Sequence, residues 1–529
     1  MNIVLTGYMG TGKTVIAQEL NNILGWELID TDELIVEQEN RSINDIFENR
    51  GEEYFRDVES EIIQKVSGLD KKIISAGGGA VLRKENILNL KKNGMVVCLT
   101  AAVEEIFYRL QHDDTRPLLK VDNPLAKIKE MLKTRAPFYA NNNYSIDTTG
   151  VGVKEIAKQI VSFMPDVIDV DLNANSYKIF VGKKYTEIVN WLPDVKGSKI
   201  LIITDSNVYP LYSNDLKNKL EAKGYTVFSQ IVPAGEEYKN LQQIHEIYKF
   251  CVEAGLDRAS LIIALGGGVV GDMAGFAAAT YLRGIKFIQA PTTLLAQVDA
   301  SIGGKTGVDL ATGKNLVGAF YQPLFVWIDP LLLHSLDEVE FKNGLAEVIK
   351  YGVIYSPTYW EFIKKNIEKI LNKDEKTIKE MLYLCAKAKA DIVSKDEKES
   401  GLRKILNFGH SLGHAIETFE HYKGLKHGQA VGLGMVFAAY LGFRLGKCDK
   451  KIEKEIQKLL ENIGFEIKTW KKRFKTGVYD IDEIINIMAK DKKMGGGRID
   501  FILPIDFGKV EIVSLDLEYI KQILGDWGN

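Results

Sequence analysis

The segment Gly7–Thr14 has the residue types and spacing of a phosphate-binding loop. It reads GYMGTGKT, a complete G-x-x-x-x-G-K-[ST] pattern between the apolar segment Asn2–Thr6 and the helical pattern Val15–Leu24. In such a loop successive backbone N–H groups surround the phosphates, the lysine reaches the terminal phosphates, and the hydroxyl binds Mg²⁺. The alternative is a glycine turn with an exposed lysine. The residues expected to hold the phosphates of a nucleotide are Gly10, Thr11, Gly12, Lys13 and Thr14.

A pair of carboxylates, Asp30 and Asp32, follows the second apolar segment, Trp26–Ile29. Their i, i+2 spacing points both side chains the same way, which suits one for a metal and the other for an acceptor hydroxyl. Asp32 is also suited to cap a helix starting at Glu33, and capping is compatible with the functional role. Separated arginines in this region are either solvated surface or grips for an anionic substrate.

A second glycine-rich segment, Leu261–Asp272, reads LIIALGGGVVGD. Gly266, Gly268 and Gly271 follow an apolar strand pattern and match G-x-G-x-x-G, the loop that lets a cofactor phosphate approach the backbone. A tight strand-to-helix turn explains the same glycines. The acidic ribose partner expected about 20 residues later is missing, because nothing acidic lies between Asp272 and Asp299.

Polar residues follow the other apolar segments of this region in the same way. Asp205-Ser206-Asn207 follows Ile200–Thr204, and Thr292-Thr293 follows Lys286–Pro291. Parallel strands bind ligands at their carboxyl ends, so we expect these residues to meet one ligand. Gly-rich loops with lysines, at Lys305 and Lys314, suit a phosphorylated substrate, although either one alone is equally typical of a solvated turn.

Four of the seven histidines fall within residues 410–427. His410 and His414 are spaced i, i+4, so they share a helix face and could bind one metal. The spacing alone does not select a third ligand.

The elements that position these residues predict an α/β protein. We expect a P-loop domain with a parallel sheet at residues 1–165, a short linker at 166–177, a Rossmann-like α/β domain at 178–330 and a mainly helical domain at 331–529. A hairpin is expected over Arg498–Ser514.

Composition excludes several classes of protein. The net charge of −3 provides no positive electrostatic field that would attract nucleic acid. The four cysteines are too scattered for a disulfide framework or a zinc knuckle. The longest apolar run, Ala430–Phe443, is too short to span a bilayer and suits a buried helix. With no signal-like segment at the N-terminus, we expect a cytoplasmic protein that binds neither membranes nor nucleic acids.

Residues 1 to about 160 resemble shikimate kinase, because GYMGTGKT, the DTD pair, GEEYFRDVE, AGGGAV, RPLL and R-x-x-x-Y occur in the family's order. The resemblance implies ATP-dependent phosphorylation of shikimate, with Asp30 reaching Mg²⁺ through water and Thr14 as a further metal ligand. Arg116 would reach the ATP phosphates, and Arg109 would lie over the adenine. No acidic residue directly follows the third strand, as in the family. Catalytic roles would fall on Lys13, Asp32 and Arg116, and shikimate would be held by Asp32, Arg56, Gly78, Gly79 and Arg135.

Residues from about 178 to 525 resemble 3-dehydroquinate synthase, on TDSNV, GEEYK, GGGVVGD, PTTLLAQVDASIGGKTGVD, GKN, AEVIKY and LNFGHSLGHAIE. The resemblance implies conversion of the sugar acid phosphate DAHP to 3-dehydroquinate with catalytic NAD⁺ and Zn²⁺ or Co²⁺. It names Glu347, His410 and His427 as metal ligands and makes His414 an acid–base residue, which reverses the i, i+4 metal hypothesis.

The same resemblance implies the remaining site residues. NAD would be bound by Asp205, Asn207, Glu236, Lys239, Gly267, Gly268, Asp272, Thr292, Thr293, Leu295, Asp299, Lys314 and Asn315. Substrate would meet Lys305, Lys350, Arg403, Asn407 and the pair Lys492 and Lys493, with Lys305 and Lys350 also catalytic. Arg283 matches a position that the family supplies across a dimer interface, so a homodimer through the synthase part is expected.

Two other functions fit parts of the sequence. A metal-dependent polyol dehydrogenase would consume NAD, but a plain alcohol gives the lysine loops no phosphate to hold. A nucleotide-sensing scaffold with an inactive kinase domain is disfavoured by the intact set of Lys13, Asp32, Arg56 and Arg116.

Overall fold

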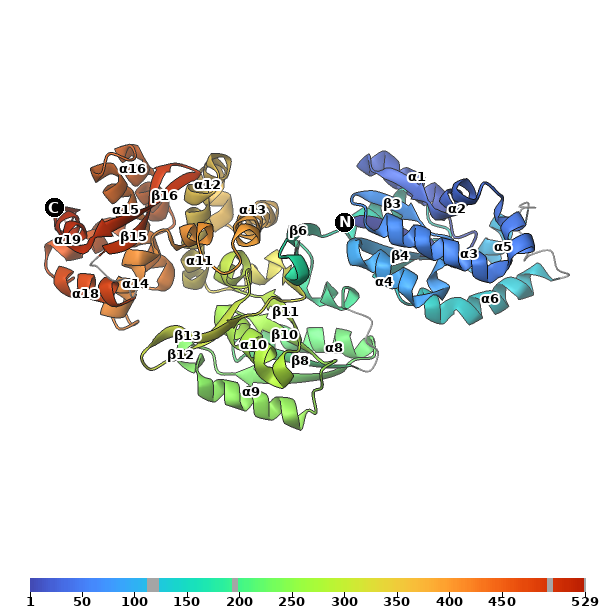
Figure 1. The fold of residues 1–529 in the computed structure, drawn as a ribbon, viewed down its shortest axis with the longest axis horizontal. Coiled ribbons are helices and arrows are strands. Elements are labelled where there is room, and N and C mark those ends of the chain that lie inside the picture. The colour runs from blue at the N-terminus through green and yellow to red at the C-terminus, as the bar shows by residue number, and fades with distance from the viewer. Residues whose placement is uncertain (112–122, 193–197, 492–497, 528–529) are drawn as a thin grey trace. The chain divides into compact units, whose positions relative to one another are not determined.

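The computed structural model describes residues 1–111, 123–192, 198–491 and 498–527. The chain forms two compact units. The first comprises Met1–Pro165 together with a short segment at Trp191, and the second comprises most of the chain from Asp166 onward. Figure 1 shows the first unit in blue to teal and the second in green to red.

A five-stranded parallel sheet forms the centre of the first unit, in the order β2-β3-β1-β4-β5. Helices cover both faces. Residues of α1 and α7 pack on Ile3 and Leu5, while α2 to α6 pack on Val4 and Ile74. This two-sided burial leaves every residue of β1 buried and explains the continuous apolar run Ile3–Leu5 at its centre. The elements are β1 (Asn2–Gly7), α1 (Lys13–Leu24), β2 (Glu27–Asp30), α2 (Thr31–Glu39), α3 (Ile43–Ser67), β3 (Lys72–Ser75), α4 (Lys84–Asn93), β4 (Gly94–Thr100), α5 (Val103–Leu110), α6 (Pro124–Tyr139), β5 (Tyr144–Asp147) and α7 (Val153–Ser162).

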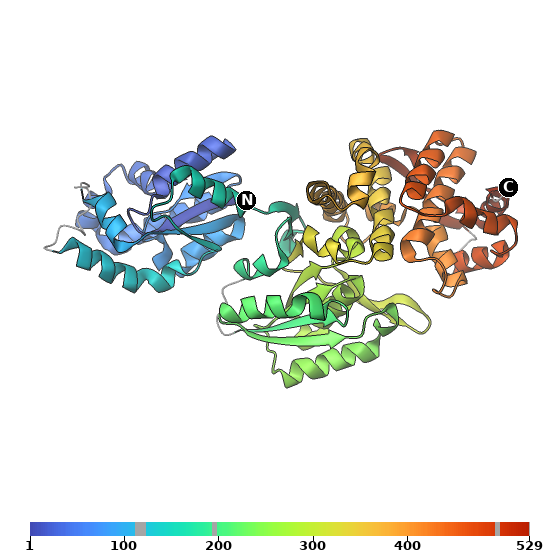
Figure 2. The ribbon, with the colours of Figure 1, turned by 180° about the vertical axis from the view of Figure 1, so that it is seen from behind.

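The second unit begins with a seven-stranded sheet in the order β6-β7-β14-β11-β10-β8-β9. All neighbouring strands are parallel except β6 and β7, so the predicted mostly parallel sheet is confirmed. Figure 2 shows helices on both sides of this sheet. The elements are β6 (Asp166–Val170), β7 (Tyr177–Val181), β8 (Lys199–Asp205), α8 (Asn214–Ala222), β9 (Thr226–Val232), α9 (Leu241–Glu253), β10 (Leu261–Gly266), α10 (Gly268–Thr280), β11 (Lys286–Pro291) and β14 (Phe325–Ile328).

Strand β6 lies within the stretch expected as a linker. Ile168 and Val170 are buried while Asp166 and Asp169 are exposed, which is the alternation of an edge strand. Val167, which is apolar but only half-buried beside Ile168, interrupts that alternation in the sequence.

Three local features of the α/β part differ from the simple strand–turn–helix expectation. Helix α10 begins at Gly268, so Val269–Asp272 belongs to the helix rather than to a preceding turn. The segment Ala296–Ala300 forms a π-helical turn, η8. The two lysine loops form a hairpin, β12 (Lys305–Leu310) and β13 (Gly313–Phe320).

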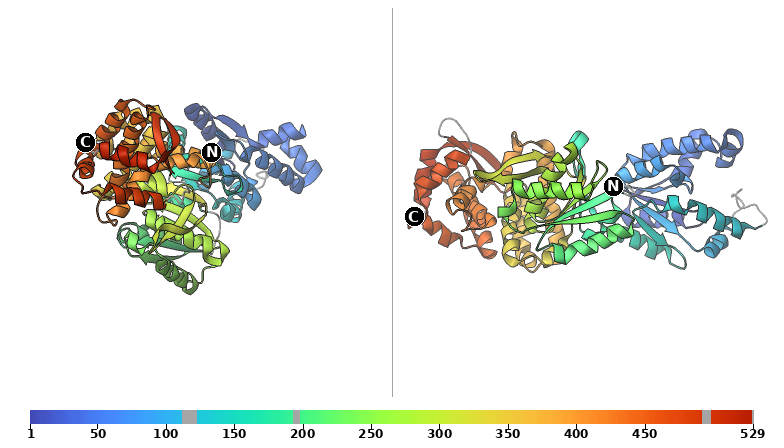
Figure 3. Two further views of the ribbon diagram at one scale, coloured as in Figure 1. Left: turned by 60° about the vertical axis from the view of Figure 1, so that its left-hand side comes forward. Right: turned by 90° about the horizontal axis from the view of Figure 1, so that it is seen from below.

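The rest of the second unit is mainly helical, as predicted, and shares one large apolar core. The expected hairpin is present and packs against α15, and Figure 3 shows it in red among the C-terminal helices. Among the described residues, no helix is both long and apolar enough to cross a membrane. The elements are α11 (Glu338–Ile354), α12 (Pro357–Leu371), α13 (Glu375–Lys395), α14 (His410–Phe419), α15 (His427–Arg444), α16 (Lys450–Asn462), α17 (Ile467–Lys475), α18 (Ile481–Asp491), β15 (Arg498–Asp506), β16 (Lys509–Asp516) and α19 (Leu517–Trp527).

Candidate active sites in the two units

The P-loop of the first unit joins the end of β1 to the start of α1. Gly7, Gly10 and Gly12 adopt positive φ values of 138°, 76° and 92°, and a Cβ on Gly7 would lie 2.3 Å from the oxygen of Leu99. The loop therefore requires glycine where the sequence has it. The Nζ atom of Lys13 donates to the main-chain oxygens of Gly7 (2.8 Å) and Tyr8 (3.1 Å). This places its positive charge at the helix N-terminus, where anions bind.

Arg109 lies beside this loop. Its guanidinium donates to the oxygen of Gly10 (3.2 Å) and to Oγ1 of Thr148 (3.1 Å), and it pairs with Glu105. Thr14 is exposed in the first turn of α1. These contacts bring the predicted nucleotide residues together at one end of the sheet.

Asp30, not Asp32, caps helix α2. Its Oδ1 atom accepts from the backbone N–H of Asp32 at 2.9 Å, and the helix starts at Thr31. The Asp32 carboxylate instead packs against Gly77, where a Cβ would lie 2.5 Å from its Oδ1. The capping alternative for Asp32 is therefore wrong, because β2 runs directly into the helix two residues earlier than expected.

Arg56 lies against Gly79, where a Cβ would come within 2.3 Å of the guanidinium nitrogens. Its partner Glu59 is fully buried, with its Oε2 atom 2.8 Å from Nη1 of Arg56, and is a residue of this region that the sequence did not single out. Burial raises the pKa of Glu59 although Arg56 opposes the shift. The i, i+3 spacing in α3 was the available signal.

Gly78 is held by Tyr139, whose hydroxyl donates to the Gly78 oxygen at 2.6 Å. Burial raises the pKa of Tyr139 to about 12, while its hydrogen bond with Arg135 lowers it. The structure thus gathers the predicted shikimate residues along the ends of β2 and β3. Arg116 lies outside the described residues.

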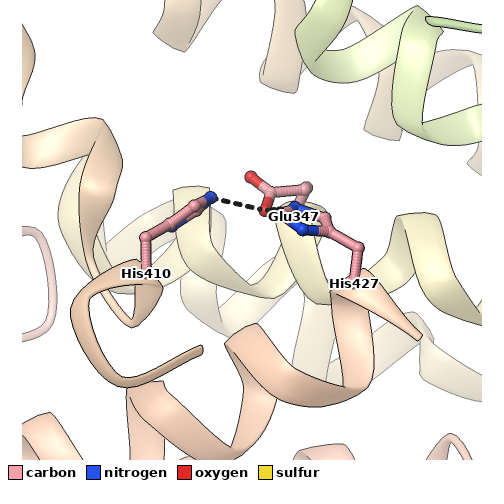
Figure 4. Close-up of side chains that lie close together, drawn as sticks. All are labelled: Glu347, His410 and His427. Atoms are coloured by element: carbon pink, nitrogen blue, oxygen red, sulfur yellow. Dashed lines mark ion pairs between the residues drawn. The ribbon is translucent and has the colours of Figure 1, made fainter. Parts of the chain in front are cut away.

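Three elements of the second unit bring Glu347, His410 and His427 together. Glu347 lies on α11, His410 begins α14, and His427 begins α15. The Nε2 atoms of His410 and His427 are 3.5 Å and 3.7 Å from Oε1 of Glu347. Figure 4 shows both rings directed at this carboxylate, and the ligand atoms of the three residues lie within 4.8 Å of one another.

Glycines set this geometry by allowing close helix contact. A Cβ on Gly434 would lie 2.0 Å from the oxygen of Gly409, so α15 touches the start of α14 directly. The backbone N–H of Gly428 donates to Oδ1 of Asn343 on α11, which fixes the start of α15. The helices can therefore place one ligand each on a common point.

The donor set of this cluster fits a divalent cation. Glu347 is 1% exposed, and neither of its oxygens accepts a well-formed hydrogen bond among the described residues. The ammonium of Lys350 pairs with one of its oxygens, and the two imidazole Nε2 atoms face the other. Burial would raise its pKa, but the neighbouring charges of Lys350 and His410 outweigh burial and hold the pKa of Glu347 at about 2. Two imidazoles and one carboxylate are typical ligands of a catalytic zinc ion.

A chain of alternating charges runs from the cluster to η8. Lys350, one turn after Glu347 on α11, pairs with Glu347 and lies 3.8 Å from Asp299. Asp299 also accepts from the Tyr351 hydroxyl (2.5 Å) and pairs with Lys389 of α13 (2.9 Å). Lys389 is buried and was missed, because nothing local distinguishes it among the lysines of that amphipathic helix.

The predicted NAD residues that follow β9, and those on α10 and in the hairpin, meet at Lys239. Its buried ammonium lies 2.6 Å from Asp272 and donates to Oδ1 of Asn315 at 2.7 Å. Glu236 lies 3.9 Å from Lys239 and 3.7 Å from Lys314. The resemblance to 3-dehydroquinate synthase predicts these residues as NAD contacts, and the structure brings them into one network.

The remaining NAD residues lie at strand ends, as expected. Asp205, the last residue of β8, accepts from the backbone N–H of Asn207 at 2.8 Å. Gly267 closely approaches Thr293, since a Cβ would lie 3.1 Å from its Cγ2, and the N–H of Thr292 donates to the Gly266 oxygen at 2.9 Å. Gly268 faces Ala300 of η8, and Leu295 immediately precedes that turn.

The predicted substrate residues Lys305 and Asn407 meet at Glu399, a residue not singled out from the sequence. Lys305 pairs with its carboxylate, and Asn407 donates to its Oε1 at 2.7 Å. Arg403 is buried and donates to the main-chain oxygens of Gly303 and Glu397. These contacts tie the Gly303 turn to the segment before α14.

Arg283 lies apart from this group, exposed on a 3₁₀ turn after α10 with φ of 66°. No ion pair between described residues involves it. Lys492 and Lys493 lie outside the described residues.

Comparisons with known proteins agree with this arrangement. Residues 229–343 and 344–494 match the family models of the N-terminal and C-terminal parts of 3-dehydroquinate synthase. A 3-dehydroquinate synthase of Thermoanaerobacter sp. (strain X514) is 45% identical over 365 residues, which are 68% of this chain and 99% of the relative. The chain belongs to the 3-dehydroquinate synthase family.

Residues 9–165 match the family model of shikimate kinase. The chain therefore combines a shikimate kinase domain with a 3-dehydroquinate synthase domain, and it has both of these enzyme activities. Both predicted resemblances are confirmed.

Two solved structures are also similar. A 2-deoxy-scyllo-inosose synthase complexed with carbaglucose-6-phosphate, NAD⁺ and Co²⁺ is 26% identical, with a TM-score of 0.60, over 68% of this chain and 99% of that chain. A shikimate kinase of Acinetobacter baumannii in complex with shikimate is 36% identical, with a TM-score of 0.30, over 30% of this chain and 90% of that chain.

Proposed function

We propose that Glu347, His410 and His427 hold the divalent metal of the synthase domain, either Zn²⁺ or Co²⁺, as it converts DAHP to 3-dehydroquinate and phosphate. The observation that carries this proposal is the buried Glu347 carboxylate facing two imidazole Nε2 atoms. When bound, the metal polarises a substrate oxygen and NAD⁺ takes up and returns a hydride.

The residues around the cluster bind the substrate and transfer protons. Lys305 and Asn407 bind the anionic groups of DAHP, and Glu399 contacts both side chains. His414, on the same face of α14 as His410, moves protons as the acid–base residue. Lys350 and Lys389 keep Asp299 ionised, because their charges hold its pKa well below the usual range despite burial.

The Lys239 network supports NAD binding at the carboxyl ends of the strands. Lys239, Asp272, Lys314 and Asn315 join α10 to the hairpin on the cofactor side of the sheet. We assign the polar contacts of NAD to these residues and to Asp205, Asn207, Glu236 and Thr293, with the Gly267–Gly268 turn facing its pyrophosphate.

In the kinase domain, Lys13 and the P-loop hold the ATP phosphates, with Arg109 beside them. Thr14 and Asp30 bind Mg²⁺, Asp30 through water. Asp32 orients the reacting hydroxyl of shikimate, and Arg56 and Arg135 pair with its carboxylate. Arg116 completes the set as a contact of the transferred phosphate.

We also propose a cytoplasmic homodimer in which Arg283 reaches the partner's site. The exposed position of Arg283, with a left-handed backbone, supports this assignment. The molar mass in solution tests it, and a monomer at micromolar concentration contradicts it.

A paired assay tests the proposed function. The first arm supplies DAHP, catalytic NAD⁺ and Zn²⁺ and measures phosphate release, and the second supplies shikimate, ATP and Mg²⁺. We expect both products and no accumulation of NADH in the first arm. Stoichiometric NADH would instead identify a polyol dehydrogenase, and the absence of the second product would identify an inactive kinase domain.

A further inference from the structure

A buried carboxylate outside the proposed ligand set, Glu417, contacts the rear nitrogen of His427. Its Oε2 atom lies 3.3 Å from Nδ1 of His427, while Nε2 of the same ring faces Glu347. Glu417 is only 7% exposed. Since an unpaired buried carboxylate is unfavourable, the contact with the ring offsets part of the cost of burying Glu417.

The position of Glu417 follows from the helix repeat of α14. His410, His414 and Glu417 are spaced i, i+4, i+7, which puts them on one face of the helix. That face is turned to α15, which packs so closely that a Cβ on Gly413 would lie 3.0 Å from the backbone of Val431. Because the two helices pack so closely, His427 at the start of α15 lies against the Glu417 carboxylate.

The second histidine of the cluster has a corresponding acceptor. Nδ1 of His410 lies 3.2 Å from the main-chain oxygen of Phe408, and its Nε2 faces Glu347. Each ring thus has an oxygen acceptor at Nδ1 and the shared carboxylate at Nε2. An acceptor at Nδ1 fixes the proton there and leaves the Nε2 lone pair for a cation.

We propose that Glu417 is a positioning residue of the metal centre. It accepts the Nδ1–H of His427, sets the tautomer and orientation of that ring, and strengthens its Nε2 atom as a ligand. The inference rests on the proposed metal site. Glu417 differs from the backbone acceptor at His410 in carrying a charge, so it makes the stronger hydrogen bond of the two.

The same contacts allow a competing role for Glu417 as a ligand itself. Ligand atoms of His414, Glu417 and His427 also lie within 4.8 Å of one another. In that case the protein would bind two cations, with His427 shared between them. Metal stoichiometry separates the two roles.

The test is the dissociation constant of Zn²⁺, measured on the full chain by competition with a chromophoric chelator. We expect Glu417→Ala to weaken binding 10- to 100-fold, as loss of an outer hydrogen-bond partner of a metal ligand does. Glu417→Gln keeps a neutral acceptor of about half the strength and should weaken binding only about 3- to 10-fold. The visible absorption of the Co²⁺ form should change in Glu417→Ala and largely return in Glu417→Gln.

Two further variants make the outcomes distinguishable. Glu453→Ala removes another buried glutamate, on α16 and paired with Lys471, and should bind Zn²⁺ within twofold of the wild type. His427→Ala should lose tight binding. If His427→Ala binds like the wild type, the proposed metal site itself is wrong.

If His427→Ala loses the metal while Glu417→Ala binds like the wild type, the role of Glu417 is wrong. A stoichiometry of two ions that falls to one in Glu417→Ala also overturns it, in favour of a ligand role. Where Glu417→Ala does not fold, the Glu417→Gln affinity decides, and a value equal to that of the wild type refutes the inference.

Discussion

The Nζ atom of Lys389 lies 2.9 Å from Oδ1 of Asp299 and donates to the main-chain oxygen of the same residue at 2.6 Å. This double contact ties helix α13 to the π-helical turn η8. It also confines an ammonium group in the core, since Lys389 is 5% exposed. Burial lowers its pKa from the ordinary 10.5 to about 8, although Asp299 opposes the shift.

The free energy of unfolding should therefore include a contribution from Lys389 that increases as the pH rises from 8 to 10.5. In this window the unfolded chain binds a proton at Lys389 and the folded chain does not, so unfolding becomes less favourable as the pH rises. The full contribution is about 3 kcal/mol. Urea unfolding at pH 7.5, 9 and 10 measures this. The free energy of unfolding of the wild type minus that of Lys389→Met should increase with pH.

Lys387→Met is the matched control for this prediction, because Lys387 lies on the same helix with 45% of its side chain exposed. It should reproduce the pH dependence of the wild type. A pH-independent difference between the wild type and Lys389→Met would show that the buried ammonium does not titrate in this range.

Gly79→Ala should impair shikimate binding and spare ATP binding. The added Cβ would lie 2.3 Å from the Arg56 guanidinium, while the φ of −99° is acceptable for alanine. Displacing a charged hydrogen-bond donor from a carboxylate costs about 1.5–3 kcal/mol, so KM for shikimate should rise at least about 10-fold.

The control for this clash is Gly152→Ala, where a Cβ meets nothing within 4 Å and φ is −70°. Steady-state kinetics with each substrate varied in turn would separate the two constants. An equal rise of both KM values in Gly79→Ala would indicate a general distortion of the kinase domain.

Lys13→Ala should remove kinase activity without affecting the synthase. The ammonium at the Gly7 and Tyr8 oxygens is positioned to reach the terminal phosphates, and loss of one such group costs about 10²–10³ in rate. The surface variant Lys92→Ala, on α4, should retain both activities. Loss of the synthase rate in Lys13→Ala would reveal coupling between the two activities.

Glu347→Gln should abolish tight metal binding and phosphate release from DAHP. Replacing the carboxylate removes the one anionic ligand of the cluster, and we expect Zn²⁺ affinity to fall by more than about 100-fold. Metal content after dialysis measures this directly, and the shikimate kinase rate of the same preparation serves as the internal control. Full synthase activity in the metal-free variant would refute the assignment.

The sequence alone identified the parts of this protein that depend on local pattern. Gly7–Thr14 was interpretable because strand, glycines, lysine and helix are contiguous, and the strand-end residues Asp205 and Thr292 followed from the order of strands and helices. The shared helix face of His410 and His414 followed from the 3.6-residue repeat.

Tertiary structure decided which of these residues meet. Glu347, His410 and His427 lie on three helices, and their common point depends on how closely glycines let α11, α14 and α15 approach. Lys389, Glu399 and Glu417 are ordinary charged residues in amphipathic segments until packing places each against a partner. Periodicity reports the face on which a side chain lies, whereas the distance between faces is set by the packing of the whole core.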